Sequence, residues 1–118
     1  MKKALELKKK YQIAREKLFD TLISNNDGVQ FNKNHTHLVD RVVKELVEEI
    51  QNQFPVSDFT LIAVGGYGRQ DLSPKSDVDL LFLYQKSNKN IRDFITLLNN
   101  SLWDLGLEVG ISYLTLKQ

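Results

Sequence analysis

Two aspartates, Asp77 and Asp79, stand at the start of an apolar run that spans residues 78–84. In a strand, side chains two residues apart point to the same face and lie about 6–7 Å apart. Two carboxylates at that separation repel by roughly 3 kcal/mol at an effective dielectric constant near 20. Mg²⁺ converts this repulsion into attraction, because it takes oxygen ligands from carboxylates and from substrate phosphates. The pair is therefore a candidate metal site, and the alternative is a solvated pair that merely enters a strand.

A glycine-rich turn precedes the aspartates in the chain and could bind an anion. Gly65, Gly66 and Gly68 can take positive φ and allow backbone N–H groups to approach a phosphate closely. Arg69 carries a permanent charge that suits a triphosphate oxygen. We expect a short helix over residues 67–72, with its first amides facing the phosphate. The alternative is a plain strand-to-helix turn, and the spacing is neither a Rossmann fingerprint nor a P-loop.

The two motifs together resemble the DNA polymerase β-type nucleotidyltransferase superfamily, in which a glycine pair, ten further residues and Asp-x-Asp follow a strand. Residues 63–69 and 76–81 more closely resemble the PII uridylyltransferase/uridylyl-removing enzyme family. Residues 102–110 resemble the next segment of that family, and residues 37–40 resemble the helix before its core. The resemblance covers about residues 35–116.

The resemblance implies uridylyl transfer from UTP to a tyrosine of the PII nitrogen-signalling protein, with Mg²⁺ or Mn²⁺ as the metal. It makes Asp77 and Asp79 the catalytic metal ligands. The residues that it places at the triphosphate are Gly65, Gly66, Gly68, Arg69 and Ser76. The expected partners are thus a nucleoside triphosphate and a PII-like protein acceptor.

A third carboxylate commonly joins the metal site of polymerase β-type enzymes from a neighbouring strand. Glu108, at the start of an alternating segment over residues 107–116, is the candidate for this third metal ligand. Asp71 and Asp104 are alternatives, and a solvated strand-entry role for Glu108 is another.

The chain departs from the family pattern after Glu-Val-Gly, where the family usually has a His and an Arg. Ile111 and Leu114 occupy those positions here. This departure favours the first of two rival functions. One is an inactive or fragmentary nucleotidyltransferase-like binding module, and the other is a stand-alone small nucleotidyltransferase that uses ATP.

The hydrophobic periodicity predicts an α/β (α+β) fold, with a small mixed sheet packed with helices. The resemblance implies that this fold is a polymerase β-type nucleotidyltransferase core. The predicted helices span residues 3–23, 36–53 and 90–105, and the predicted strands span residues 59–64, 78–84 and 107–116. Because the second strand is apolar on both faces, we expect it to be buried on both sides. We expect residues 1–54 to form a helical lead-in and residues 55–118 to form a truncated core, together one compact domain.

His35 and His37 form a His-x-His pair near the predicted start of the second helix. A metal site there would need a third ligand that the sequence does not identify, so a loop or capping role is the better interpretation.

The composition narrows the class of protein further. The 118 residues carry a net charge of +1 and contain no cysteine. The near-balanced charge gives no basic stripe for nucleic acid, and no apolar run is long enough to span a bilayer. The lack of cysteine suits a reducing compartment, so we expect a cytoplasmic protein without a membrane or nucleic-acid partner.

Overall fold

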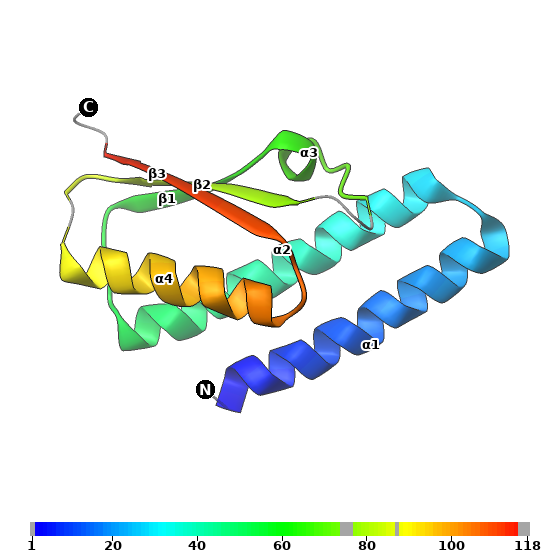
Figure 1. Cartoon of the computed structure of the whole chain (residues 1–118), viewed down its shortest axis with the longest axis horizontal. Coiled ribbons are helices and arrows are strands. Elements are labelled where there is room, and N and C mark those ends of the chain that lie inside the picture. Colours follow the sequence, from blue (N-terminus) through cyan, green and yellow to red (C-terminus); the bar gives the residue numbers. More distant parts are fainter. Residues whose placement is uncertain (1, 74–76, 87, 116–118) are drawn as a thin grey trace.

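The computed structural model describes residues 2–73, 77–86 and 88–115, with side chains from residue 5 onward in the first helix. This part of the chain contains four helices and three strands (Figure 1). In order they are α1 (Lys2–Asn25), α2 (Gly28–Gln53), β1 (Phe59–Val64), α3 (Gly65–Gly68), β2 (Val78–Tyr84), α4 (Lys89–Asp104) and β3 (Val109–Thr115). The predicted α/β class with a small mixed sheet is confirmed.

The sheet places β2 in the centre, with the strand order β1-β2-β3. β1 runs antiparallel to β2, whereas β3 runs parallel to it, and α4 supplies the crossover that two parallel neighbours require. Asp79 pairs with Val64 of β1 and with Gly110 of β3. The second aspartate of the motif therefore lies in the middle of the sheet, near the end where β1 leads into α3.

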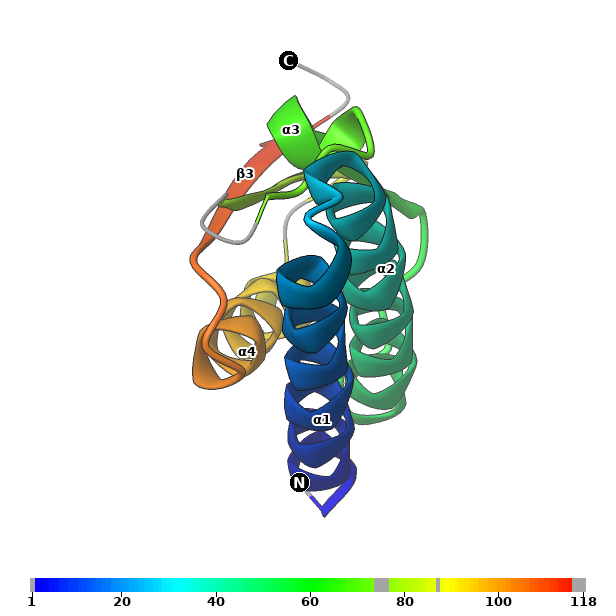
Figure 2. The same ribbon diagram turned by 90° about the vertical axis from the view of Figure 1, so that its right-hand side faces the viewer.

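The three long helices all lie on one side of the sheet, as Figures 1 and 2 show from two directions. β2 accordingly buries alternate side chains against these helices, among them Leu80 and Phe82, which are 2% and 0% exposed. Leu81 and Leu83 point to the opposite face and are only half-buried. The prediction that this strand is buried on both sides is wrong for the described chain, because no described helix covers the second face.

An aromatic cluster joins the sheet to α4. The rings of Phe59 and Phe82 stack with centroids 4.9 Å apart, and Phe94 of α4 packs against both. Phe82 and Phe94 are completely buried. Aromatic rings of this size bury a large apolar area, so the cluster fixes α4 beneath β1 and β2.

Helix α2 begins earlier than its sequence pattern predicts. Asp27 caps the helix, and its carboxylate accepts a hydrogen bond of 3.0 Å from the backbone N–H of Gln30. Phe31 and His35, one turn apart and both buried, extend the apolar stripe ahead of residue 36, where the pattern predicts the start of the helix. His35 and His37 thus lie inside α2, and the loop or capping interpretation of the pair is wrong.

The buried stripe of α2 packs on the sheet and on α4, so its residues belong to the same core as the strands. Leu46 and Ile50 are 1% and 0% exposed. The division into a lead-in over residues 1–54 and a core over residues 55–118 stays a prediction. No helix in the described parts of the chain combines the length and apolarity needed to cross a bilayer.

Candidate functional site

The carboxylate of Asp79 lies on the sheet face opposite the helices, in a space left by two glycines. A Cβ atom on Gly65 would sit 3.0 Å from Oδ2 of Asp79, and one on Gly110 would sit 3.3 Å from Oδ1. The first separation is too short for a real Cβ contact without movement, and the second is tight. Asp79 is therefore flanked by the glycine turn on one side and by bare backbone of β3 on the other.

Asp77 and Glu108 directly precede β2 and β3 in the chain. Asp77 is exposed. The N–H of Val78 donates a 2.8 Å hydrogen bond to the backbone carbonyl of Glu108, so the two chain segments are already paired at this point. Across the described residues, no three acidic or histidine side chains come close enough to hold a metal ion. Glu108 as a third ligand stays a prediction.

The two alternative third ligands have other roles in the described structure. Asp104 ends α4 in the helical layer, and its carboxylate lies 3.8 Å from Nζ of Lys8. That position is on the far side of the sheet from the Asp79 carboxylate. Asp71 accepts a 2.8 Å hydrogen bond from Nδ2 of Asn32 on α2. Ser76, predicted to contact a phosphate, lies outside the described residues.

The glycine turn is a single helical turn, Gly65–Gly68, placed directly after β1. The predicted helix over residues 67–72 is therefore wrong in both its start and its end. Gly65 has φ +63, a left-handed conformation that glycine adopts without strain. A Cβ atom on Gly68 would lie 2.6 Å from the carbonyl oxygen of Ala63, so a side chain there would strike the backbone of β1. These contacts explain two of the three glycines by local geometry.

Arg69 caps the C-terminus of α3 and is exposed. Its N–H donates to the carbonyl of Gly65 at 3.1 Å, and its Nη2 atom lies 3.8 Å from the position of a Cβ on Gly66. The guanidinium group therefore lies beside the turn, where its permanent positive charge can reach an anion bound there.

Helix α2 holds the segment that follows the turn. The Thr36 hydroxyl accepts a 3.1 Å hydrogen bond from the N–H of Leu72, while the carbonyl of Leu72 lies 3.1 Å from Nδ1 of His35. Together with the bond from Asn32 to Asp71, these contacts come from one side of the helix. The backbone after the turn is thus fixed at both its N–H and its carbonyl group.

His35 is a buried structural residue, 2% exposed. Since a carbonyl oxygen can only accept, Nδ1 carries the proton and donates it to Leu72, and Nε2 accepts from the hydroxyl of Tyr11 at 3.3 Å. Burial lowers the pKa of His35, because the charged form loses solvation. Both ring nitrogens already have protein partners, which leaves none for a metal ion.

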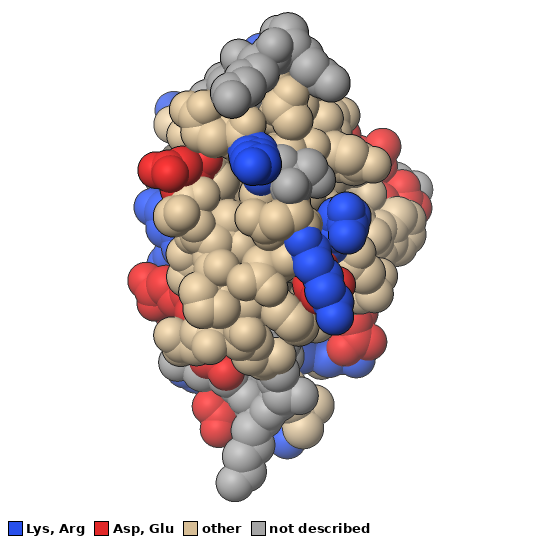
Figure 3. Space-filling view, turned by 90° about the vertical axis from the view of Figure 1, so that its left-hand side faces the viewer, with Lys and Arg blue, Asp and Glu red and all other residues tan. Residues whose placement is uncertain are grey.

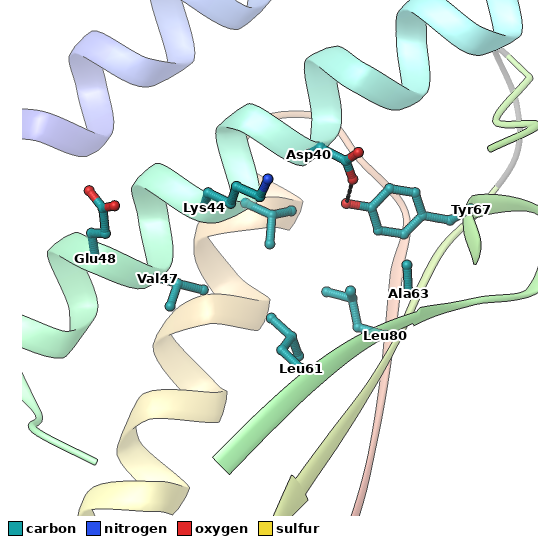
Figure 4. Close-up of a pocket in the computed structure, with 9 residues that line it drawn as sticks. Asp40, Lys44, Val47, Glu48, Leu61, Ala63, Tyr67 and Leu80 are labelled. Carbon is teal, nitrogen blue, oxygen red and sulfur yellow. Dashed lines mark hydrogen bonds between the residues drawn. The ribbon is translucent and has the colours of Figure 1, made fainter. Parts of the chain in front are cut away.

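Tyr67 is the large side chain within the glycine turn, and it points away from Asp79 into the helical side of the sheet. Its ring is 3% exposed, and its hydroxyl donates a 2.6 Å hydrogen bond to Oδ1 of Asp40 on α2 (Figure 4). Burial raises the pKa of Tyr67, and the Asp40 carboxylate raises it further. The phenol therefore keeps its proton and ties the turn to α2.

Sequence reasoning missed the roles of Gly110 and Tyr67. A glycine inside a strand often marks a place where another group approaches closely, and Gly110 carries that signal. Tyr67 gives no comparable signal, since a tyrosine between glycines does not indicate which way it points. The sequence around its partner, Asp40, indicates only that Asp40 belongs to a helical segment.

Charged side chains are dispersed over the end of the molecule shown in Figure 3. Among the described residues visible on that face, acidic and basic groups lie next to each other around a broad uncharged surface. The functional groups of the candidate site gather instead where β1, β2 and β3 meet α3. There, carboxylate oxygens suited to a hard cation lie beside a glycine turn and an arginine suited to an anion.

Comparisons with known proteins agree with this arrangement. Residues 43–116 match the nucleotidyltransferase domain family. The chain is 39% identical over 106 residues to a bifunctional uridylyltransferase/uridylyl-removing enzyme of Pseudomonas fluorescens SBW25, covering 89% of this chain and 12% of that protein. It is 41% identical over 81 residues to the enzyme of the same name from Hydrogenovibrio crunogenus, covering 66% of this chain and 9% of the relative. No solved structure gives a significant match.

Proposed function

This chain belongs to the nucleotidyltransferase domain family, and we propose that it takes part in uridylyl transfer from UTP to a tyrosine of a PII-type signalling protein. The observation that carries the proposal is the position of Asp79 directly against Gly65, which brings a cation ligand and an anion-binding turn together. The choice of a uridylyl group as the group transferred rests on the names of the curated relatives, which are uridylyltransferases. The chain spans 12% or less of the length of these relatives. The activity of the whole enzyme is therefore a proposal for this chain.

The donor set fits Mg²⁺ or Mn²⁺. Asp77 and Asp79 would hold the ion, with carboxylate oxygens of the type that hard divalent cations prefer. When bound, the metal supplies positive charge that neutralises the phosphates and the departing pyrophosphate. Asp79 is held between two glycines at a fixed place in the central strand, and exposed Asp77 remains accessible to solvent.

The turn would orient the triphosphate of UTP. Gly65 and Gly66 present backbone without side chains, Gly68 packs the turn on β1, and Arg69 adds a positive charge beside it. Ser76 would contribute a hydroxyl to a phosphate oxygen or to the first aspartate. Catalysis by these groups is mainly positioning, which converts a reaction between two partners into one within a bound complex.

The proposed reaction is an in-line displacement at the α-phosphorus of UTP. The phenolic oxygen of the acceptor tyrosine forms a bond to that phosphorus, and the bond to the bridging oxygen breaks. Pyrophosphate leaves with the electron pair of the broken bond, and the phenolic proton passes to water. The product is a tyrosine that carries a uridylyl group.

Transfer of label from α-³²P-UTP to a purified PII-type protein tests the proposal. The wild-type chain with Mg²⁺ should label the acceptor, and replacement of the acceptor tyrosine by phenylalanine should abolish labelling. Asp79→Asn should remove activity, whereas Asp104→Asn, an equal change in charge in the helical layer, should retain it. Labelling from ATP in place of UTP would contradict the assigned base. Absence of labelling from either nucleotide would favour a binding module.

A further inference from the structure

We propose that Asp40 is a positioning residue for the triphosphate-binding turn and that it acts through its hydrogen bond with Tyr67. The inference rests on the proposed function, because it assigns the turn to the triphosphate of UTP. It adds a residue on α2, on the opposite side of the sheet from the Asp79 carboxylate, to those that control nucleotide binding.

The first step in the argument is the place of Tyr67 within the turn. Its neighbours Gly66 and Gly68 have no side chains, so the tyrosine side chain is the one in this part of the turn that can attach the turn to the rest of the protein. The ring is 3% exposed, and its hydroxyl donates to Asp40 at 2.6 Å. A hydrogen bond to an ionised carboxylate is shorter and stronger than one between neutral groups. The orientation of the turn is therefore linked to a specific acceptor on α2.

The second step is the lack of free space around the rest of the turn. A Cβ atom on Gly68 would lie 2.6 Å from the carbonyl of Ala63, and one on Gly65 would lie 3.0 Å from Oδ2 of Asp79. The backbone of the turn thus lies close to β1 and to the Asp79 carboxylate at once. A small rotation after loss of the Tyr67 anchor would alter both the backbone that faces the triphosphate and its contact with Asp79.

The third step concerns solvent. Asp40 and Tyr67 line an open pocket of about 370 Å³ between α2 and the sheet, together with Lys44 and Glu48 at its rim (Figure 4). Asp40 is only half-buried. Water entering the pocket can replace a missing partner of the Tyr67 hydroxyl, which limits the loss of stability when Asp40 is changed. Variants at Asp40 should therefore fold and report on positioning.

The test compares four variants of the full chain. Asp40→Leu removes the acceptor and keeps the branching and the number of heavy atoms of the side chain, and Asp40→Asn keeps an acceptor oxygen in the same place. Tyr67→Phe removes the donor and keeps the ring. Glu48→Leu is the matched control, because Glu48 lines the same pocket on the same helix but lies two turns further along it than Asp40.

Two measurements are made on each variant: amide hydrogen exchange over residues 65–72, and the affinity for Mg²⁺-UTP by titration calorimetry. Asp40→Leu and Tyr67→Phe should speed exchange in this segment and weaken Mg²⁺-UTP binding by roughly tenfold, since misplacing a binding group by a fraction of an ångström has effects of this order. Asp40→Asn should rescue most of the affinity, and Glu48→Leu should match the wild type. In steady-state assays the loss should appear mainly in KM for UTP, because the turn holds the substrate before and during the reaction.

The outcomes separate this inference from the proposed function. Wild-type affinity in Asp40→Leu and Tyr67→Phe would overturn the positioning role and leave the proposed function intact. A wild-type chain that does not bind Mg²⁺-UTP would overturn the proposed function. In that case hydrogen exchange alone would test whether the bond between Asp40 and Tyr67 anchors the turn. Unchanged exchange in Asp40→Leu and Tyr67→Phe would overturn that role.

Discussion

Oδ2 of Asp79 lies 3.0 Å from the point where a Cβ atom on Gly65 would stand. The last pairing of β1 with β2, between Val64 and Asp79, brings the turn and the carboxylate to the same place. The glycine at position 65 thus serves two needs at once: it permits a left-handed backbone and leaves room for the carboxylate. Substitutions at this contact can separate these two effects.

Gly65→Ala should destabilise the chain and impair the site. A left-handed conformation costs an alanine about 1–2 kcal/mol, and the new methyl group would also displace Asp79. Urea denaturation measures the stability change. Gly28→Ala is the control, because a Cβ atom on Gly28 would meet nothing within 4 Å and the residue has no positive φ. It should be neutral or stabilising by up to about 1 kcal/mol. Equal stability of the two variants would contradict the assigned backbone strain.

Gly110→Ala should weaken metal binding while leaving stability nearly unchanged. The position lies in β3 without positive φ, so alanine fits the strand, but its methyl group would lie 3.3 Å from Oδ1 of Asp79. Interference next to a metal ligand typically costs about 10-fold or more in affinity. Mn²⁺ titration followed by electron paramagnetic resonance measures the effect. Ser112→Ala, two residues along the same strand and exposed, should bind Mn²⁺ like the wild type; a matching loss there would remove Gly110 from the site.

The order of the long helices and the strands could be predicted from the sequence, because the helices carry apolar stripes and the strands are short apolar or alternating runs. The stripe of α2 from Val39 to Ile50 is an example, and the buried residues agree with it. The continuous apolar run of β2 predicts a strand but not which of its faces is buried. The start of α2 could not be predicted, because polar residues surround Phe31 and His35 and no apolar stripe is recognisable there. The helix nevertheless begins directly after its cap, Asp27. Burial of that end depends on contacts with α1 and the turn, which are distant in the sequence.

The candidate site was predictable only in part. The proximity of Asp79 to the glycine turn follows from the antiparallel pairing of two recognisable strands. Its contact with Gly110 depends on the register of β3, which no local pattern fixes. The bond between Tyr67 and Asp40 joins residues 27 positions apart and depends on how α2 crosses the sheet.

Truncations in β2 should reveal the one-sided burial of the sheet. Phe82→Ala should cost about 3–5 kcal/mol, because Phe82 is completely buried against Phe59 and Phe94. Leu83→Ala, at the adjacent half-buried position, should cost clearly less. Chemical denaturation of both variants gives the comparison. Similar losses at the two positions would indicate that both faces of the sheet are covered in solution.

Stability should fall as the pH drops below 6.5 because of His35. Burial lowers the folded-state pKa of this histidine below its ordinary value of 6.5, so the unfolded chain takes up a proton first. The contribution is therefore fully present above pH 6.5 and is lost as the pH falls toward the lowered value, by up to about 1.4 kcal/mol per pH unit.

A His37→Gln background isolates this effect, since the chain contains only two histidines. Urea denaturation between pH 7.5 and 5.5 should show a steeper loss in that background than in the variant that also carries His35→Gln. Identical slopes would show that His35 does not couple folding to protonation.

The central claim is tested most directly by the gain in the free energy of unfolding that UTP produces with and without Mg²⁺. The gain is measured in the wild type and in Asp79→Asn. The wild type should be stabilised by UTP with Mg²⁺, by about 2.7 kcal/mol at a ligand concentration 100 times Kd. Asp79→Asn should lose this metal-dependent gain, and Asp104→Asn should keep it. A gain that persists undiminished in Asp79→Asn would contradict the assignment of the metal and nucleotide site to the junction of β2 with the glycine turn.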